Sequence, residues 1–306
     1  IYAGDGNRLS LAATFPQLRE TELRYGSLTR GMLHALRDNG KGHQPAQRRP
    51  ASAFLTPRTG LAEIIEALER RLAGADVRKG TAAVRVEPLP GEGYRVRLAG
   101  RDWIETSSVI LATPAFVSAQ LVEGLDARMA ADLESIPYAS TATVSLAFPL
   151  SAIPRALDGY GYIVPQAEGR PILACTWTST KFPHRAPDGF ALIRAFIGRA
   201  GKEDLLEADD QALVHVVRTE LEQVMGVRAA PILQRVFRWP QAMPQYILGH
   251  PDRLASIERG LHAHPGMQLA GSAYRGIGLP DCIASGEAAA TAALSHVQSM
   301  ERERSR

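Results

Sequence analysis

The residues with the clearest chemical meaning lie near the end of the chain, in the segment LAGSAYRGIGLPDCIASG at positions 269–286. A short apolar run stops at Gly271, a loop with two further glycines follows, and an alanine-rich helix is expected to start at Pro280. Gly276 and Gly278 have no side chain, so a flat ligand can approach the backbone closely. The positive end of the helix would then favour an anion, such as a phosphate or the edge of a reduced flavin. The alternative is an ordinary strand–turn–helix corner with no ligand.

Other common signatures of catalysis are absent from the sequence. It contains no GxSxG, no HExxH, no P-loop and no GxGxxG followed by a helix. His262 and His264 lie in an expected surface loop, so we predict no metal site. Cys175 and Cys282 are far apart and outside any CxxC motif, which favours a reducing compartment without disulfides. The net charge of +3 is scattered along the chain, which argues against nucleic acid as a partner.

The first third of the chain has the spacing of helices followed by a run of strands. Apolar residues interrupted by Pro16 and Gly26 predict two or three short helices over residues 9–36. Residues 60–72 have an amphipathic pattern typical of a helix, and the Gly-, Pro- and Arg-rich residues 38–52 are expected to form a loop. Alternating segments then predict a three-stranded meander that leads into a strand buried on both faces. The predicted strands are 82–87, 94–98, 103–106 and 108–114.

The middle of the chain has a different pattern, with strands separated by Pro and Gly and one long amphipathic helix at 203–226. This pattern predicts a mixed sheet covered by helices, and therefore a second domain in an α/β (α+β mixed) fold. In the final helix, an apolar face with small residues is expected to pack close to a sheet. That face contains Ile283, Gly286, Ala290, Ala293, Leu294 and Val297. The predicted strands of the second domain are 141–150, 160–165, 172–179 and 190–198.

The segment at 269–286 resembles the C-terminal flavin motif of the protoporphyrinogen oxidases, a family of amine oxidase-like flavoproteins. Thr59 stands where that family usually has a glycine, but further segments match in order and extend the resemblance over nearly the whole chain. These segments are IYAGDGNRLSLAATFPQL, FLTPRTGLAEIIEALERRL, GYGYIVP, TKFP and RWPQAMPQYILGH. The resemblance implies the C-terminal part of a two-domain FAD-dependent oxidase fold, truncated at its N-terminus and without the Rossmann βαβ unit.

The resemblance also implies how the chain is divided. Residues 1–50 would be the remainder of a helical membrane-binding and substrate region, and 51–115 a segment of the FAD domain. Residues 116–235 would form the substrate-binding domain, with its mixed sheet, and 236–306 the C-terminal FAD segment. The implied cofactor is FAD. The glycine fingerprint that holds the pyrophosphate in such proteins is missing here, so we expect these residues alone to hold FAD weakly.

The resemblance further implies site residues, position by position. No catalytic acid or base is expected, because a flavin supplies the difficult chemistry. Expected cofactor contacts are Val84, Trp239, Met243, Gly271, Ile277, Gly278 and Leu279. Expected substrate contacts are Gly4, Tyr160, Ile163, Thr176 and Phe196. Each has an ordinary structural alternative, such as core packing for Phe196, and the neighbouring Arg194 is expected to have a cross-strand or solvated role.

The reaction that the resemblance implies is oxidation of protoporphyrinogen IX to protoporphyrin IX in haem biosynthesis, with oxygen as acceptor and hydrogen peroxide as product. One alternative is oxidation of coproporphyrinogen III, which carries more propionates, so basic residues around the substrate slot should discriminate the two. Another alternative is an inactive remnant that binds porphyrin. The expected partners are a porphyrinogen and oxygen, with a homodimer left open. We expect a cytoplasmic location, either free or in peripheral contact with the cytoplasmic membrane.

Overall fold

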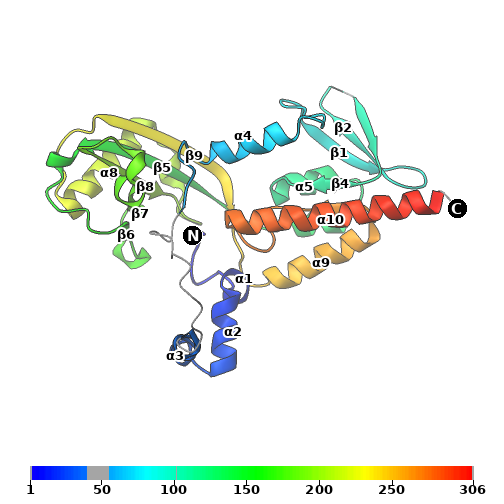
Figure 1. The fold of residues 1–306 in the computed structure, drawn as a ribbon, viewed down its shortest axis with the longest axis horizontal. Helices are drawn as coiled ribbons and strands as arrows, with labels where there is room; N and C mark the ends of the chain where they lie inside the picture. Colours follow the sequence, from blue (N-terminus) through cyan, green and yellow to red (C-terminus); the bar gives the residue numbers. More distant parts are fainter. Residues whose placement is uncertain (1, 40–54, 101, 305–306) are drawn as a thin grey trace.

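The computed structural model describes residues 2–39, 55–100 and 102–304, so the loop expected at 38–52 lies almost entirely outside the described residues. Figure 1 shows an elongated molecule with a five-stranded sheet at one end and a three-stranded sheet at the other. A two-stranded sheet lies with the three-stranded one, flanked by helices. The predicted α/β fold with two different sheet-containing parts is confirmed.

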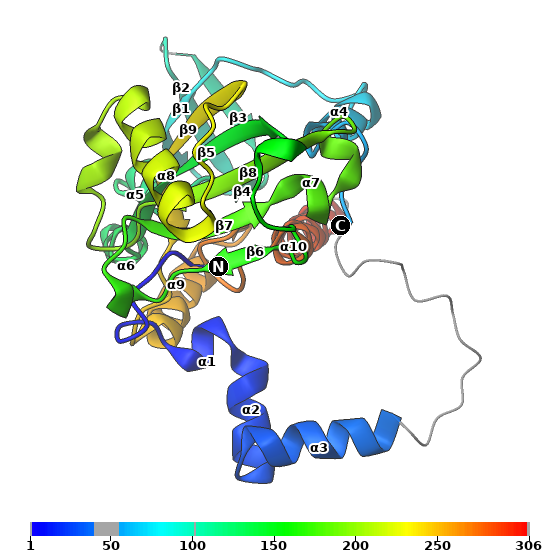
Figure 2. The same ribbon diagram turned by 90° about the vertical axis from the view of Figure 1, so that its left-hand side faces the viewer.

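The chain begins with the three short helices that the spacing predicts: α1 (Leu11–Thr14), α2 (Pro16–Tyr25) and α3 (Leu28–Asn39). Gly26 ends α2 in the left-handed conformation, at φ 69°. Both views show α2 and α3 extending away from the rest of the molecule (Figures 1 and 2). None of the helices among the described residues has the length and apolar character needed to cross a bilayer.

The predicted meander is present as β1 (Ala83–Pro88), β2 (Tyr94–Leu98) and β3 (Trp103–Thr106), all antiparallel. It leads into β4 (Val109–Leu111), which pairs in parallel with β10 (Met267–Leu269). The prediction that this strand is buried on both faces is wrong. Val109 and Leu111 are buried, but Ile110 points to the other face of the sheet and is 41% exposed.

A first hydrophobic core lies between these strands and three helices: α5 (Ala115–Val122), α6 (Ala127–Glu134) and α9 (His250–Ala263). Leu133 and Ile257 from the helices pack with Val86 and Met267 from the strands. Asp126 caps α6, since its carboxylate accepts hydrogen bonds from the backbone N–H groups of Arg128 and Met129. This core unites segments more than 100 residues apart, which gives β4 and β10 a fixed position.

Two predicted helices form where expected but bury less than expected. Helix α4 (Ala62–Arg71) leaves Ile65 57% exposed, because no described element covers its apolar stripe. Helix α10 (Leu279–Arg304) places Ile283 and Leu294 in solvent, 50% and 62% exposed. The buried residues of α10 are Ala289, Ala293 and Met300. The predicted apolar face is therefore wrong for its two largest members.

The five-stranded sheet has the order β6 (Gly161–Ile163), β7 (Ile172–Trp177), β8 (Phe190–Ile197), β5 (Tyr138–Pro149), β9 (Leu233–Pro244). The sheet was expected to be mixed, but every neighbouring pair is antiparallel. The short helix α7 (Thr178–Lys181) follows β7 directly, and the strands are joined by hairpins and longer returns rather than by parallel crossovers.

One face of this sheet carries the second hydrophobic core, which is closed by α8 (Asp210–Met225). The helix was expected from residue 203, but it starts seven residues later. Asp209 sets this start, because its side chain accepts a hydrogen bond from Ala212 N at 2.8 Å. The candidate substrate residues lie on the opposite face, which points away from α8 and its core and which we call the uncovered face.

The two cores show where the chain passes from one region to the other. Helices α5 and α6 follow residue 115 but contribute to the first core. Strand β9 starts before residue 236 and continues within the five-stranded sheet to Pro244. The division of the chain into functional domains at 115 and 235 stays a prediction.

Gly161 offers a direct test of the edge strand β6. Its φ is 133°, and an added Cβ would lie 1.9 Å from the carbonyl oxygen of Cys175. We expect Gly161→Ala to lower the free energy of unfolding by at least about 2–3 kcal/mol, because both the backbone and the β6–β7 pairing must shift. The matched control is Gly169→Ala, at φ 65° with open space around it, which should cost only about 1 kcal/mol. Equal losses in urea unfolding would contradict the clash.

Candidate functional site

The glycine loop begins at Gly271, directly after β10. The backbone N–H of Gly271 donates to the hydroxyl of Ser285 in α10 at 3.1 Å. Its φ is 121°, and a Cβ added there would meet no atom within 4 Å. The backbone at Gly271 therefore borders open space, into which a flat group could pack.

The other two glycines of the loop are explained by their packing. Asp281, the third residue of α10, accepts a hydrogen bond from Gly278 N at 3.1 Å, in the manner of a capping box. A Cβ on Gly276 would lie 2.5 Å from Cγ of Asp281, and one on Gly278 would lie 2.8 Å from its Oδ2. Helix α10 begins at Leu279, one residue before the expected start at Pro280. The structural alternative thus accounts for Gly276 and Gly278, but not for Gly271.

Tyr246 holds this loop in place. Its side chain is fully buried, and its hydroxyl accepts a hydrogen bond from Gly276 N at 2.8 Å and donates one to Ser272 O at 2.7 Å. Burial raises the pKa of the phenol above its usual value, so the hydroxyl stays protonated. The ring stacks on His250 with centroids 4.2 Å apart. The sequence motif PQYILGH contains both residues, but nothing in its spacing marks them as contacts of a loop 30 residues away.

His250 supports the same loop from the start of α9. Its Nε2 lies 3.0 Å from the carbonyl oxygen of Tyr274, and its Nδ1 has no hydrogen-bond partner among the described residues. Burial lowers its pKa below the usual value of 6.5. The neutral imidazole is therefore the form that the fold favours.

A second group of candidate residues lies on the uncovered face of the five-stranded sheet. Residues opposite one another on neighbouring strands share a face, so the register defines rows across the sheet. Two adjacent rows, which we call the apolar row and the cationic row, contain most of the predicted substrate residues. From β9 to β6, the apolar row contains Phe237, Thr143, Phe196, Ala174 and Ile163, and the cationic row contains Arg235, Ser145, Arg194, Thr176 and Gly161.

A cavity of about 600 Å³ opens on this face. Phe196 lines it from β8, and Trp239 and Met243 line it from β9. Trp239 stands opposite Thr141, in the row next to the apolar row, and is 52% exposed. The structure thus brings two residues predicted to border the flavin onto the same surface as the predicted substrate residue Phe196.

The remaining predicted site residues lie elsewhere or have another explanation. Val84 lies in β1 and is 46% exposed, and β1 is far from the start of α10 in Figure 1. Tyr160 directly precedes the edge strand β6 and is 48% exposed, whereas Ile163 stays in the apolar row and is 83% exposed. A Cβ on Gly4 would lie 2.5 Å from Oε1 of Gln245, so packing requires this glycine.

Ile277, Gly278 and Leu279 remain together with Gly271 in the glycine loop. They are continuous in sequence, and Leu279 is 49% exposed at the start of α10. The N-terminal end of α10 points toward the five-stranded sheet in Figure 1. The predicted residues therefore form two groups, one in the glycine loop and one on a face of the five-stranded sheet.

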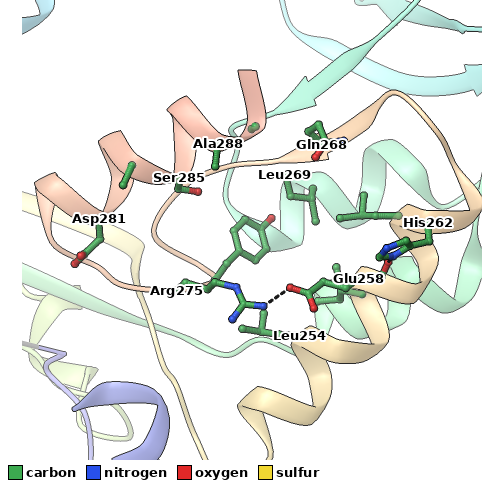
Figure 3. Close-up of a pocket in the computed structure, with 14 residues that line it drawn as sticks. Leu254, Glu258, His262, Gln268, Leu269, Arg275, Asp281, Ser285 and Ala288 are labelled. Carbon is green, nitrogen blue, oxygen red and sulfur yellow. Dashed lines mark hydrogen bonds and ion pairs between the residues drawn. The ribbon is translucent and has the colours of Figure 1, made fainter. Parts of the chain in front are cut away.

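A further cavity of about 630 Å³, which the sequence does not indicate, lies between α9 and α10 (Figure 3). Leu254 of α9, Leu269 of β10 and Ala288 of α10 contribute to its mostly apolar lining. At one side, Arg275 forms an ion pair with Glu258. The lining comes from α9, β10, α10 and the loop that holds Tyr274 and Arg275, so this cavity depends on the tertiary arrangement.

The cysteines and the two histidines near residue 263 add no reactive thiolate or metal site among the described residues. Both cysteines are free, and burial raises the pKa of Cys175 to about 12, so its thiol is protonated at neutral pH. His264 approaches Asp126 at 3.4 Å, and His262 lies within α9 rather than in the expected surface loop. No group of three metal-ligating side chains occurs in the described part of the chain.

Comparison with known proteins assigns the fold and the loop to one family. Residues 1–294 match the family described as flavin containing amine oxidoreductase. The chain belongs to this family. A variant of putrescine oxidase shares the fold, with a TM-score of 0.59 and 15% identity over 76% of this chain and 52% of that one.

Nearer relatives of this flavin-containing family member are porphyrinogen oxidases. The coproporphyrinogen III oxidase of Bacillus subtilis is 35% identical over 97% of this chain and 62% of the relative. The chloroplastic protoporphyrinogen oxidase of Oryza sativa is 27% identical over 92% of this chain and 56% of the relative. A solved structure from Exiguobacterium sp. 255-15, provisionally assigned as a protoporphyrinogen oxidase, has 32% identity and a TM-score of 0.78, covering 99% of this chain and 61% of that one. The chain thus spans less than two thirds of these proteins.

The family supports the FAD cofactor that the resemblance implies, and the glycine loop fits part of that group. The open space beside Gly271 accepts a flat ring against the backbone. The N-terminal end of the 26-residue helix α10 supplies a positive dipole end at the same place. Asp281 partly offsets this dipole, because its carboxylate already occupies the first turn.

Tyr246→Phe tests the attachment of the loop. We expect a loss of about 2–3 kcal/mol in unfolding free energy, because Gly276 N–H and Ser272 C=O lose their partner inside the protein. Hydrogen exchange at the Gly276 amide should become faster. The control is Tyr94→Phe, which removes a single hydrogen bond to Pro265 O in the other part of the first core. An unchanged exchange rate at Gly276 would show that Tyr246 does not hold the loop.

His250 predicts a dependence of stability on pH. Its pKa is lowered in the folded protein, so the unfolded chain binds more protons once the pH falls below about 6.5. The unfolding free energy should therefore decrease as the pH drops from 6.5 through the lower folded pKa. In His250→Gln this decrease should be smaller, while the control His215→Gln, at an exposed position of α8, should behave like the wild type. Parallel pH profiles for all three proteins would contradict the prediction.

Proposed function

We propose that the chain forms the substrate face and part of the flavin site of an FAD-dependent porphyrinogen oxidase, with coproporphyrinogen III as the preferred substrate. The observation that carries this proposal is the register of the five-stranded sheet. It places Ile163, Thr176 and Phe196 in two adjacent rows of one uncovered face, with Trp239 beside them. A broad, mostly apolar face suits a large flat tetrapyrrole, which needs few polar anchors.

The choice of substrate follows the relatives. The Bacillus subtilis coproporphyrinogen III oxidase is more similar to this chain than the Oryza sativa protoporphyrinogen oxidase, at 35% against 27% identity. Protoporphyrinogen IX is the second candidate, supported by the plant relative. Oxygen is the electron acceptor in this proposal, and hydrogen peroxide is the product.

FAD, when bound, would supply the two-electron oxidation chemistry. The residues of this chain would then bind and orient the cofactor and the substrate. Gly271 and the start of α10 would hold the ring end of the cofactor, and Trp239 and Met243 would border it from β9. Phe196 and Thr176 would position the macrocycle on the sheet face. The cavity at this face contains no acidic or basic residue, in keeping with a site where the protein excludes water and aligns the reactants.

The helices at the start of the chain support a further part of the proposal. Leu23 and Leu36 are 73% and 70% exposed on α2 and α3, which extend away from both sheets (Figure 2). Peripheral contact with a membrane would cover these side chains. Peripheral membrane contact and a homodimer complete the proposal, and neither positions a reacting group.

The activity can be tested by joining this chain to the part of the Bacillus subtilis relative that it does not match. The joined protein should load FAD and form fluorescent porphyrin from coproporphyrinogen III faster than from protoporphyrinogen IX, with consumption of oxygen. A flavin-loaded protein that oxidises an alkyl amine but neither porphyrinogen would overturn the proposal. A protein that loads FAD and binds porphyrin without turnover would identify the inactive alternative.

Phe196→Ala in the joined protein tests the substrate face. We expect the KM for the porphyrinogen to rise roughly tenfold with unchanged flavin content, because half-buried aromatic surface that would contact the substrate is lost. The fold should lose little, since Phe196 points away from the core carried by the other face. The control is Phe190→Ala, six residues away on the same strand, or about 20 Å. An unchanged KM with a stability loss of roughly 3–5 kcal/mol would make Phe196 a core residue.

A further inference from the structure

The cationic row concentrates positive charge at one side of the substrate face. Arg194 of β8 and Arg235 of β9 stand on either side of Ser145 of β5, directly opposite it in both registers. Two strand spacings separate the backbones at these arginines by about 10 Å. Both residues are exposed, with the guanidinium of Arg194 partly buried, and both lie on the face opposite the α8 core. The two guanidinium groups therefore flank one stretch of the sheet without being neighbours of each other.

Neither arginine has an acidic partner among the described residues. Arg194 donates from Nε to the hydroxyl of Ser145 at 3.2 Å, which is the cross-strand contact expected for it. Arg235 donates to the carbonyl oxygen of its neighbour Gln234 at 2.9 Å. A guanidinium has five N–H donors, and single neutral acceptors leave most of them free for a ligand. Two other arginines of this domain do have acidic partners, Arg170 with Glu220 and Arg238 with Asp210.

The surroundings of Arg194 make its charge unfavourable. Partial burial, and in second place the positive charge of Arg185, lower the pKa of Arg194. An arginine stays protonated in spite of such a shift, so the unfavourable energy remains until an anion approaches. Arg185 itself is held by Thr56 Oγ1 and Pro57 O, at 2.7 and 3.1 Å. No Asp or Glu occupies any position of the apolar or cationic rows.

The position of this charge relative to the apolar row fits a ligand with two kinds of surface. Phe196 is two residues from Arg194 on β8, and Phe237 is two residues from Arg235 on β9, so each arginine has an aromatic ring beside it on the same face. A flat apolar body on the aromatic side chains would carry its acidic substituents over the arginines. Guanidinium groups bind carboxylates through paired N–H donors.

We propose that Arg194 and Arg235 form a carboxylate-binding subsite that takes propionate groups of the tetrapyrrole and thereby favours the substrate with more carboxylates. This inference rests on the proposed function and assigns the basic residues that distinguish coproporphyrinogen III from protoporphyrinogen IX. A purely structural role explains less, because a cross-strand contact to Ser145 needs neither a permanent charge nor a second arginine on the other side.

The test measures binding of coproporphyrin III, the stable oxidised form, to the 306-residue chain by fluorescence quenching at neutral pH. Its uncharged tetramethyl ester serves as the second probe. The variants are R194Q, R235Q and the double variant, with R218Q as a matched control at an exposed position of α8, which packs on the other face. R194K tests whether charge alone is enough. Thermal unfolding of each variant checks that the fold is retained.

Each single variant should raise the Kd for coproporphyrin III roughly threefold to tenfold, as expected for an exposed charge-assisted hydrogen bond. R194K should recover part of this loss, and R218Q should bind like the wild type. Added salt should weaken binding by the wild type but hardly by the double variant. None of the variants should change the Kd for the ester.

Three outcomes would overturn the proposal. If the wild type binds both probes and the arginine variants bind coproporphyrin III equally well, the subsite is wrong and the proposed function stands. If the variants weaken binding of the acid and the ester equally, the arginines act through packing, and the subsite is again wrong. If the wild type binds neither porphyrin, the result counts against the proposed function as well.

Discussion

The hydroxyl of Tyr246 makes the interaction on which both candidate sites depend. It follows β9 directly, so it belongs to the end of the five-stranded sheet, yet its two hydrogen bonds reach Ser272 and Gly276 in the glycine loop. A fully buried phenol leaves such bonds only at the cost of unpaired polar groups, which makes the link between sheet and loop stiff. Through this side chain, the segment that follows β9 helps to hold the loop that leads into α10.

The second constraint is strand register. A shift of one residue in β8 would exchange the two faces of that strand, sending Phe196 and Arg194 into the core and Ile193 and Ala195 to the surface. The core on the α8 side prevents that shift, because its side chains are fully buried. Packing on one face therefore determines the chemistry available on the other. The core on the α8 side thus sets the register that forms the apolar and cationic rows, although no residue of these rows belongs to that core.

Two helices, α4 and α10, leave apolar side chains exposed. Ile65 on α4 and Ile283 on α10 lie in solvent here, and β10 has a single strand partner. The relatives are longer, with the chain spanning 62% of the Bacillus subtilis protein and 61% of the Exiguobacterium structure. Amphipathic patterns in a sequence record the surface that a helix buries in the whole protein, so in a chain that matches only part of its relatives they predict more burial than the chain shows.

The sequence by itself determined the elements and the family. The three short helices, the meander, the helix at 60–72 and the glycine loop at 271–278 all appear where local spacing placed them, because period and turn residues act over short distances. Only the tertiary structure decided which residues meet. Packing against Asp281 gives a structural reason for Gly276 and Gly278, and Tyr246 binds a loop that no local pattern connects to it. The alternation around Phe196 predicted a strand but not its neighbours, since the pairing of Arg194 and Arg235 across Ser145 is set by register between strands 40 residues or more apart in sequence.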